Sequence, residues 1–444
     1  MATQSTWPTK RLKEIAEFRN GLNYNKNSFG VGIKVVGVSD FQDYTRPKYD
    51  ELKEINPKGI VTERNILRDG DIVFVRSNGN RELIGRSLYI EKPPEEITHS
   101  AFTIRLRFST SGVYPKFFAY FFRTPDIRQA LTAYGGGTNI SNLNQDILNA
   151  LEVPFPFLPT QRKIAAILSA YDDLIENNLR RIKILEEMAL NLYREWFVKF
   201  RFPGHQLFRF IDSSLGRIPD GWEVKALGSL IAEHIGGGWG NDIEDDKHFE
   251  PAWVIRGTDI PDARSCNFPK VPFRYHAKSN LKSRCLMPGD IVFEVSGGSK
   301  GQPLGRSLYV SSELLAAFNG DSVICASFCK RIQPNSKHYA SELLYLSFLD
   351  AYASGEIEQY QVQSTGISNY KWSDYLEKVS RCVPPVVLQN HFCEFCIPLF
   401  SEIATLGRKN TALRRTRDLL LPRLISGEVD VSDLDIAVPE EVDD

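Results

Sequence analysis

The sequence lacks any hydrophobic run long enough to cross a membrane. Across its 444 residues, no uninterrupted apolar stretch approaches the roughly 18–20 residues that a bilayer requires. The first residues, MATQSTWPTKRLKE, contain no apolar core of the kind that a secretory signal peptide carries. We therefore expect a soluble, cytoplasmic protein.

Short catalytic and nucleotide-binding motifs are also absent. The sequence has no GxxxxGK[ST] phosphate loop, no GxGxxG dinucleotide turn, no HExxH zinc helix and no [DN]PP[YFW] stretch typical of amino-methyltransferases. The glycine run at 236–241 lacks the strand-turn-helix spacing of a nucleotide site, and no short constellation sets Asp, His and Ser in nucleophile and base roles. We therefore predict no catalytic residue and no cofactor bound by this chain.

Cysteine is missing from the first half of the chain. All seven cysteines lie at or after position 266, and an odd, one-sided set does not indicate a disulfide framework, so we expect reduced thiols. Cys393 and Cys396, near His391 and Cys382, have the spacing of a zinc knuckle. The helical spacing of Phe392, Phe395, Cys396, Leu399, Ile403 and Leu406 favours buried core cysteines instead, and we predict no metal site.

Net charge is small, but its distribution along the chain is uneven. The formal charge is −1, and from Glu428 onward there are eight acidic residues and no basic one. Residues 1–427 therefore carry seven more basic than acidic side chains. This mild excess permits a nucleic-acid partner, although an ordinary solvated surface with a disordered acidic end explains it equally well.

What the sequence does contain is a long internal repeat. GDIVFVRSNGNRELIGRSLY begins at Gly70, and GDIVFEVSGGSKGQPLGRSLY begins at Gly289. RLKEIAEFRNG at 11–21 resembles KALGSLIAEHIGG at 225–237, and GGTNISN at 136–142 resembles QSTGISN at 363–369. Because these matches are collinear, with offsets of about 215 to 230, they indicate a tandem duplication of roughly 200 residues.

Each repeat predicts an α+β globular domain. DIVFVR and SLYIEK, like DIVFEV and SLYVSS, are short β-branched and aromatic runs that read as strands joined by a polar loop. Residues 115–131 and 338–353 predict compact helices, the first opened by Pro115.

A long helix is predicted after each domain. Residues 160–199 contain no glycine or proline, and Thr160 suits an N-cap. An apolar stripe follows at steps of three and four, formed by Ile164, Ile167, Tyr171, Leu174, Asn178, Ile182, Leu185, Ala189, Leu192 and Trp196. A matching helix is expected over about 388–420, so the two should pack as an antiparallel coiled coil. Asn178 either fixes the register of this pair or lies solvated at a frayed seam.

The middles of the repeated cassettes differ, and their residue types suit DNA contact. Glycine allows close backbone approach, while amide, hydroxyl and basic groups bind phosphates or base edges. An ordinary solvated loop is the alternative for 75–84 and 294–304, and a helix N-cap at Ser141 or Ser368 is the alternative for the GISN-type segments. The candidate DNA-contacting residues are Arg76, Ser77, Asn78, Asn80, Arg81, Thr138, Asn139, Ser141, Ser296, Ser299, Lys300, Gln302, Gln363, Ser364, Thr365 and Ser368.

Together these features resemble the DNA specificity subunit of type I restriction-modification systems. The resemblance rests on the duplicated GDIVF…GRSLY cassette, on TNISN and TGISN, on LPTQRKIAAILSAYDDLIENNLRRIKILEEMALNLYREWF and on the terminal LLLPRLISGEVDV. It covers essentially the whole chain. No single motif is decisive, but their order and duplication are specific.

The resemblance implies a fold, a function and partners. It implies two target-recognition domains at 1–159 and 204–387, helical spacers at 160–203 and 388–429, and an acidic tail at 430–444 that lies near the N-terminus. Each domain would read one half of a bipartite, gapped site in double-stranded DNA, and the helices would dock two methyltransferase subunits, to which restriction/translocase subunits are added. S-adenosylmethionine, ATP and Mg²⁺ would belong to those partners.

Two other functions remain open from the sequence. A non-catalytic coiled-coil adaptor that binds protein would need exposed apolar patches on its domains, whereas the quoted loops are polar. A self-contained restriction or modification enzyme would need an active site that none of the motifs supplies.

Overall fold

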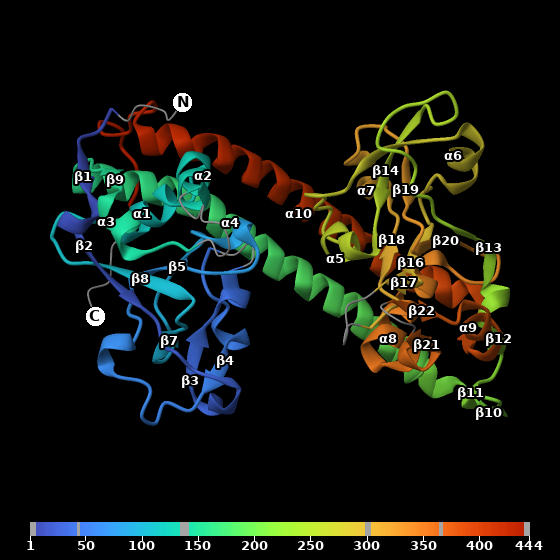
Figure 1. The fold of residues 1–444 in the computed structure, drawn as a ribbon. Helices are drawn as coiled ribbons and strands as arrows, with labels where there is room; N and C mark the ends of the chain where they lie inside the picture. Colours follow the sequence, from blue (N-terminus) through green and yellow to red (C-terminus); the bar gives the residue numbers. More distant parts are fainter. Residues whose placement is uncertain (1–5, 42–44, 134–141, 298–302, 364–366, 439–444) are drawn as a thin grey trace. The chain divides into compact units, whose positions relative to one another are not determined.

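The computed structural model describes residues 6–41, 45–133, 142–297, 303–363 and 367–438, and the chain divides into two compact units (Figure 1). Unit 1 comprises residues 1–173 and 413–444, and unit 2 comprises residues 174–412. Both contain helices and sheets. Two long helices, α4 (Leu158–Tyr193) and α10 (Val386–Ser426), each contribute a segment to both units.

Unit 1 is built on an antiparallel four-stranded sheet of order β2-β8-β5-β6. A three-stranded sheet of order β4-β3-β7 has one parallel pair, β3 with β7, and β1 pairs with β9. The elements are β1 (Thr9–Arg11), β2 (Ala16–Asn20), β3 (Phe29–Val36), β4 (Lys53–Ile55), β5 (Ile72–Val75), β6 (Ser87–Tyr89), β7 (Ile97–His99), β8 (Thr103–Phe108), α1 (Pro115–Phe121), α2 (Pro125–Ala133), α3 (Gln145–Ala150) and β9 (Glu152–Pro154).

Unit 2 contains sheets of the same size and order. Its four-stranded antiparallel sheet runs β13-β20-β16-β18, its three-stranded sheet runs β15-β14-β19 with β14 parallel to β19, and β12 pairs with β23. Two further sheets, β10-β11 and β17-β22-β21, have no counterpart among the strands of unit 1 that the structure describes. The strands are β10 (Phe210–Ser213), β11 (Gly216–Pro219), β12 (Glu223–Ala226), β13 (Ile231–Gly236), β14 (Glu250–Ile255), β15 (Phe273–His276), β16 (Ile291–Glu294), β17 (Ser296–Gly297), β18 (Ser307–Tyr309), β19 (Val323–Cys325), β20 (Cys329–Pro334), β21 (Gln361–Gln363), β22 (Ser368–Tyr370) and β23 (Ser380–Val383). The helices are α5 (Ile260–Ala263), α6 (Lys278–Arg284), α7 (Ser312–Ala316), α8 (Ser341–Ser354) and α9 (Trp372–Lys378).

In each unit, the repeated cassette forms two neighbouring strands and their connection, as predicted, the first strand inside the four-stranded sheet and the second at its edge. In unit 1, β5 pairs antiparallel with β6, and in unit 2, β16 pairs antiparallel with β18. Both β5 and β16 are buried on both faces, because successive side chains of a strand point to opposite sides. Ile72 and Phe74 enter one core cluster of unit 1, whereas Val73 and Val75 enter another.

The two shorter predicted helices differ from expectation. The segment at 115–131 is not one helix: α1 ends at Phe121 and α2 begins at Pro125. Pro125 has no N–H to continue the ladder and disfavours helical geometry at Thr124. In unit 2, α8 begins at Ser341 rather than at His338, because the residues before it form a turn in which the N–H of Tyr339 bonds Asn335 O.

The long helices exist, with altered ends. α4 begins two residues before Thr160, so the predicted N-cap at Thr160 is wrong, and its hydroxyl instead lies 3.1 Å from Ser432 Oγ. A π-helical segment, Arg194–Val198, follows α4. α10 continues through Pro422 to Ser426, six residues beyond its expected end, and stops before Gly427, whose φ of +82° is the left-handed conformation that terminates helices.

Segments of α4 and α10 contact each other in both units, and in unit 2 the contacts show that they run antiparallel. In unit 2, Asn178 contacts Asn410 while Arg181 contacts Glu402, so a higher number in α4 meets a lower one in α10. Ile182 packs with Ile403 and Leu406. In unit 1, Arg417 donates to Asp172. The members of the predicted stripe are buried or half-buried except Leu174, which is 51% exposed while neighbouring Ile175 is buried.

The cysteine pair of α10 lies in the core of unit 2. Cys393 and Cys396 both belong to its largest hydrophobic cluster, as the helical spacing predicted. Phe395, which the same spacing assigned to the core, is instead 50% exposed. None of the described helices has the length and hydropathy to span a membrane.

The first described residues of the chain contact the end of α10 in unit 1. The N–H of Thr6 donates to Ser426 O at 2.9 Å, and Val431 is buried in the unit 1 core with Leu12. The start of the acidic tail therefore packs beside the N-terminal segment, as expected, rather than extending freely.

Candidate nucleic-acid interface

The polar loop of unit 1 starts at a junction of three segments that lie far apart in the sequence. The N–H groups of Arg76 and Ser77 both donate to Phe102 O, at 2.8 and 3.3 Å. The N–H of Leu143 donates to Arg76 O at 2.9 Å, and Ser77 forms an isolated antiparallel bridge with Asn142. The variable loop and the TNISN segment, recognised separately in the sequence, are thus adjacent.

Unit 2 repeats this junction residue for residue. The N–H groups of Val295 and Ser296 donate to Phe328 O at 2.9 and 3.2 Å, and the N–H of Tyr370 donates to Val295 O at 2.9 Å. Ser296 pairs with Asn369 in β17-β22, where its hydroxyl also donates to Asn369 Oδ1 at 2.8 Å. The second variable loop is therefore anchored beside the TGISN segment in the same way.

Behind each junction lies a tight turn that a glycine supports. The turns are 100–103 and 326–329, each closed by a hydrogen bond from its fourth N–H to its first carbonyl. Gly21 and Gly237 donate to Thr103 O and Cys329 O. A Cβ on Gly21 would lie 2.2 Å from Ser100 O, and one on Gly237 would lie 2.2 Å from Ala326 O, so only glycine fits either position.

In unit 1, the predicted contact residues within the described part occupy one loop. Arg76, Ser77 and Asn78 are half-buried, while Asn80 and Arg81 are exposed. Asn78 and Asn80 accept hydrogen bonds from Asn80 N and Glu82 N through their side-chain oxygens, which shapes the loop. Thr138, Asn139 and Ser141 lie outside the described residues.

In unit 2, the structure brings Ser296, Ser368 and Gln363 together in the β17-β22-β21 sheet. Gln363 is exposed, but Ser368 is 8% exposed and pairs with Gly297 and Gln363. The alternative role of Ser368 as a helix N-cap is wrong, because the residue lies within β22. Ser299, Lys300, Gln302, Ser364 and Thr365 lie outside the described residues.

Four residues at the two junctions were missed by the sequence analysis. Asn142 and Asn369, the last residues of the two ISN motifs, are exposed and stand opposite the loops. Phe102 and Phe328 are 60% and 52% exposed at the turns. The sequence did contain a signal for Phe102 and Phe328, because SAFT at 100–103 resembles ASFC at 326–329.

Three arginines lie on the strands next to the unit 1 turn. Arg19 of β2 stands directly opposite Arg105 of β8, and Arg107 binds both oxygens of Asp71 at 2.7 and 2.6 Å. Burial, followed by the charges of Arg105 and Arg107, lowers the pKa of His99 to about 3. His99 is therefore neutral at ordinary pH, while Arg105 is buried and Arg107 is paired with Asp71, so neither arginine offers an unpaired charge to a phosphate backbone.

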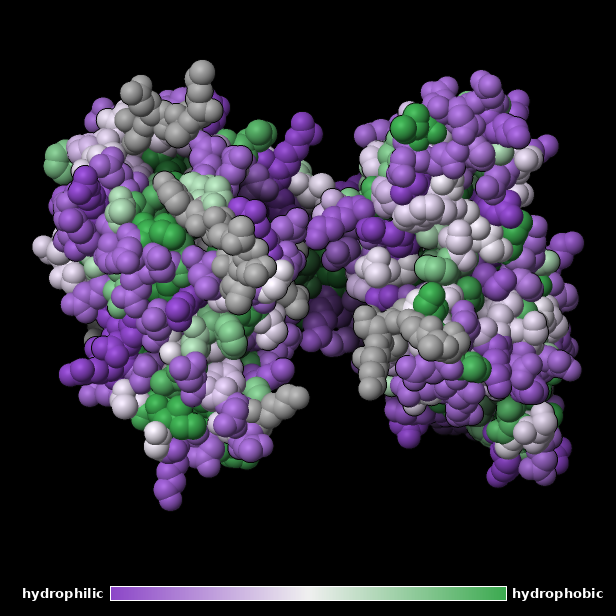
Figure 2. All heavy atoms as spheres, viewed as in Figure 1, coloured by the Kyte–Doolittle hydropathy of each residue, from purple (hydrophilic) through white to green (hydrophobic). Residues whose placement is uncertain are grey.

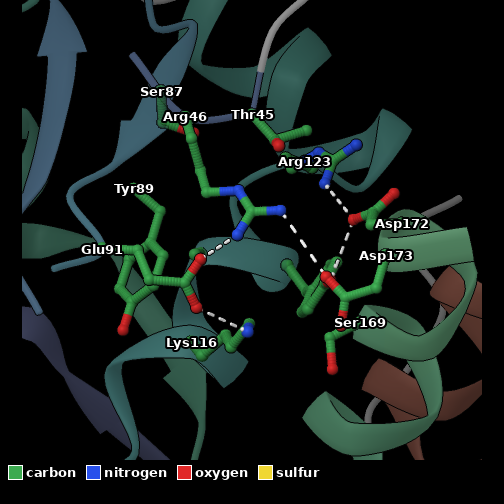
Figure 3. Close-up of a pocket in the computed structure, with 12 residues that line it drawn as sticks. Thr45, Arg46, Ser87, Tyr89, Glu91, Lys116, Arg123, Ser169, Asp172 and Asp173 are labelled. Carbon is green, nitrogen blue, oxygen red and sulfur yellow. Dashed lines mark hydrogen bonds and ion pairs between the residues drawn. The ribbon is translucent and has the colours of Figure 1, made fainter. Parts of the chain in front are cut away.

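A second cluster in unit 1 is structural. Figure 3 shows Arg46 reaching toward both Glu91 and Asp173, with Lys116 paired to Glu91 and Arg123 to Asp172. Tyr120 also donates to Asp172 at 2.9 Å. These contacts join α1 to α4. Because the basic side chains of the pocket already pair with carboxylates, they offer little to an anionic ligand.

The described residues contain no group of three or more His, Cys, Asp or Glu side chains that could hold a metal ion. On the face that Figure 2 draws, hydrophilic side chains predominate and hydrophobic ones occur in small separate groups.

Comparison with known proteins agrees with this geometry. Residues 4–187 match the model of the type I restriction modification DNA specificity domain. The chain is 27% identical to the type I restriction enzyme MjaIX specificity subunit of Methanocaldococcus jannaschii, across 96% of this chain and 94% of that protein. It is 23% identical to the StySPI specificity subunit of Salmonella potsdam, across 95% and 89%.

A solved structure shares the fold. The type I restriction-modification S subunit from M. genitalium aligns with a TM-score of 0.52 and 13% identity, over 95% of this chain and 96% of that one. Residues 4–187 thus carry the type I restriction modification DNA specificity domain, and over nearly its whole length the chain is similar in sequence to type I restriction enzyme specificity subunits.

Proposed function

We propose that each unit reads one half of a bipartite, gapped DNA site, and that the paired segments of α4 and α10 set the gap as an antiparallel coiled coil. The observation that carries this proposal is the repeated junction. Two loops of different sequence, at 76–84 and from 295 onward, are anchored by the same backbone bonds to Phe102 and Phe328. An identical support with divergent polar side chains suits two readers of different sequences.

The fold is accordingly proposed to be a tandem repeat. The target-recognition domains would span 1–159 and 204–387, the helical spacers 160–203 and 388–429, and the acidic tail 430–444. The matching strand orders of the two units support this division. The DNA-contacting residues would be those predicted in the two loops and the two ISN segments, together with the exposed Asn142 and Asn369.

The chain itself is a non-catalytic specificity subunit. We propose that its helices dock two methyltransferase subunits, to which restriction/translocase subunits are added. S-adenosylmethionine, ATP and Mg²⁺ would be bound by those partner subunits. Phosphate neutralisation by basic side chains would make DNA affinity fall steeply with salt.

An exchange of loops tests the proposal. Residues 75–84 are replaced by 294–304 in one variant, and the reciprocal replacement is made in a second. Each is expressed with the neighbouring methyltransferase, and methyladenine is mapped by single-molecule sequencing. We expect wild-type methylation at a gapped two-part motif and a changed base preference in one half-site per variant, a different half for each.

The two variants serve as controls for one another. Unchanged motifs in both soluble complexes would exclude these loops as readers. If the wild-type complex is soluble but methylates no gapped motif, a protein-binding adaptor becomes the better description.

A further inference from the structure

Each unit exposes one phenylalanine at the third position of an equivalent turn. Phe102 stands in the turn 100–103 and Phe328 in the turn 326–329, and more than half of each side chain is accessible to solvent. Exposed apolar rings are common singly, but two at matched positions of the two units are a shared feature.

The backbone beneath each ring is held from two sides. On one side, the carbonyl of each phenylalanine accepts two N–H groups from the start of the variable loop. On the other side, Gly21 and Gly237 approach so closely that neither tolerates a Cβ. In unit 1, the Thr103 hydroxyl also donates to Ser100 O at 2.7 Å and contacts His99 Nδ1 at 2.9 Å. The rings are therefore exposed side chains on a firmly held backbone.

Polar residues suited to DNA contact lie in the segments that join the backbone of both phenylalanines. Asn142 and Asn369 are exposed. They pair with Ser77 and Ser296, which lie at the starts of the two loops. An apolar ring among hydrogen-bond donors matches a nucleic acid, whose bases offer flat apolar faces close to charged phosphates.

We propose that Phe102 and Phe328 are stacking residues, each inserting at its half-site against a base or base step next to the bases that the adjoining loop reads. This inference rests on the proposed function and assigns it two further contact residues. Because every base has a π-face, stacking adds affinity and local unstacking without selecting a sequence, whereas the polar loop selects.

The test uses the complete chain in complex with its methyltransferase subunits, and a duplex carrying the methylated motif. 2-Aminopurine is placed at successive positions of each half-site, away from the target adenines, so that a fluorescence increase reports unstacking. Variants are Phe102→Ala, Phe328→Ala and the ring-retaining Phe102→Tyr and Phe328→Tyr. Phe157→Ala and Phe249→Ala, which change phenylalanines that are 87% and 46% exposed elsewhere, are matched controls.

We expect Phe102→Ala to abolish the fluorescence increase in one half-site and Phe328→Ala to abolish it in the other. Each should weaken binding roughly 10- to 100-fold, with the same salt slope and the same methylation motif as wild type. The Tyr variants and both controls should behave as wild type.

Two results would overturn the inference. If the Ala variants bind within twofold of wild type and leave the fluorescence unchanged while loop exchange still alters the motif, the proposed function stands and the stacking role fails. If the wild-type complex recognises no gapped motif, both fail.

Discussion

The side-chain amide of Asn178 donates a 2.8 Å hydrogen bond to Oδ1 of Asn410, and both side chains are buried within unit 2. The Asn410 amide also donates to Ile175 O at 3.4 Å. Two roles were considered for Asn178, and the structure shows the buried contact between the helices rather than a solvated side chain. Sliding either helix by one turn would leave both amides buried without these partners, so the pair specifies one alignment of α4 with α10.

Replacing one member of this pair should cost more than replacing both. Asn178→Leu leaves Asn410 buried without its main partner, and we expect a loss of about 1–3 kcal/mol in the free energy of unfolding. Asn178→Leu with Asn410→Leu should recover most of it. Urea denaturation of the wild type, Asn178→Leu, Asn410→Leu and the double variant gives the coupling energy between the two positions. Additive losses would show that the two amides act independently.

Gln161 and Gln389 make the same three hydrogen bonds in the two units. Gln161 accepts from Tyr114 N and donates to Gly112 O and Pro156 O, and Gln389 accepts from Ala340 N and donates to His338 O and Pro384 O. We expect Gln161→Ala or Gln389→Ala to lower stability by about 1–3 kcal/mol, because buried backbone groups lose their partners.

Thermal unfolding measures this effect. Gln161→Glu should also destabilise, because a carboxylate can accept from Tyr114 N but cannot donate to two carbonyls. The matched control is Gln359→Ala at an exposed position, expected to change stability by less than about 0.5 kcal/mol. Equal melting temperatures for the Gln161 and Gln359 variants would contradict the prediction.

Asp172 should make the stability of unit 1 depend on pH in the acid range. Burial alone would raise the pKa of this carboxyl, but the charges of Arg123 and Arg417 outweigh burial and hold its pKa below the usual range. Its contribution is therefore complete above the pKa of about 3.9 in the unfolded chain, and it is lost as pH falls through the lower folded value.

Asp172→Asn removes that contribution. We expect a loss of about 2–3 kcal/mol at neutral pH, since two arginines lose a largely buried partner, and a flatter decline of stability below about pH 4. Denaturation followed at several pH values tests both points, with the exposed Asp433→Asn as control. A parallel decline in both variants would show that Asp172 does not carry the pH dependence.

The glycines behind the two turns should be intolerant of alanine. Gly21→Ala and Gly237→Ala each place a methyl group 2.2 Å from a backbone oxygen, which requires the turn to move, and we expect losses of about 3 kcal/mol or more. Gly30→Ala and Gly236→Ala, which meet no atom within 4 Å, should change stability by less than about 1 kcal/mol. Similar melting temperatures for all four variants would refute the close approach.

Much of the fold could be predicted from local pattern. The strands of the repeated cassette, the long helices and the burial of Cys393 and Cys396 follow from residue type and periodicity. Helical steps of three or four allow either Leu174 or Ile175 after Tyr171, and only packing against α10 decides that Ile175 is buried. The break between α1 and α2 was signalled by Pro125, but the continuous apolar pattern masked it.

The junctions could be predicted only in part. The loops and ISN motifs were visible as repeats, but their adjacency depends on backbone bonds between residues far apart, such as Leu143 N to Arg76 O. No side-chain pattern encodes such a bond. Ser368 shows the consequence, because its place in β22 depends on pairing with Gly297 some 70 residues earlier.

The anchoring of the variable loops has an evolutionary consequence. At both junctions, the bonds that hold the loop start join main-chain N–H groups to main-chain carbonyls, and these groups are common to nearly all amino acids. Substitutions in the loop can therefore accumulate without dismantling its attachment. A lineage carrying this chain could acquire a new target by drift in a few side chains while the surrounding architecture is inherited unchanged.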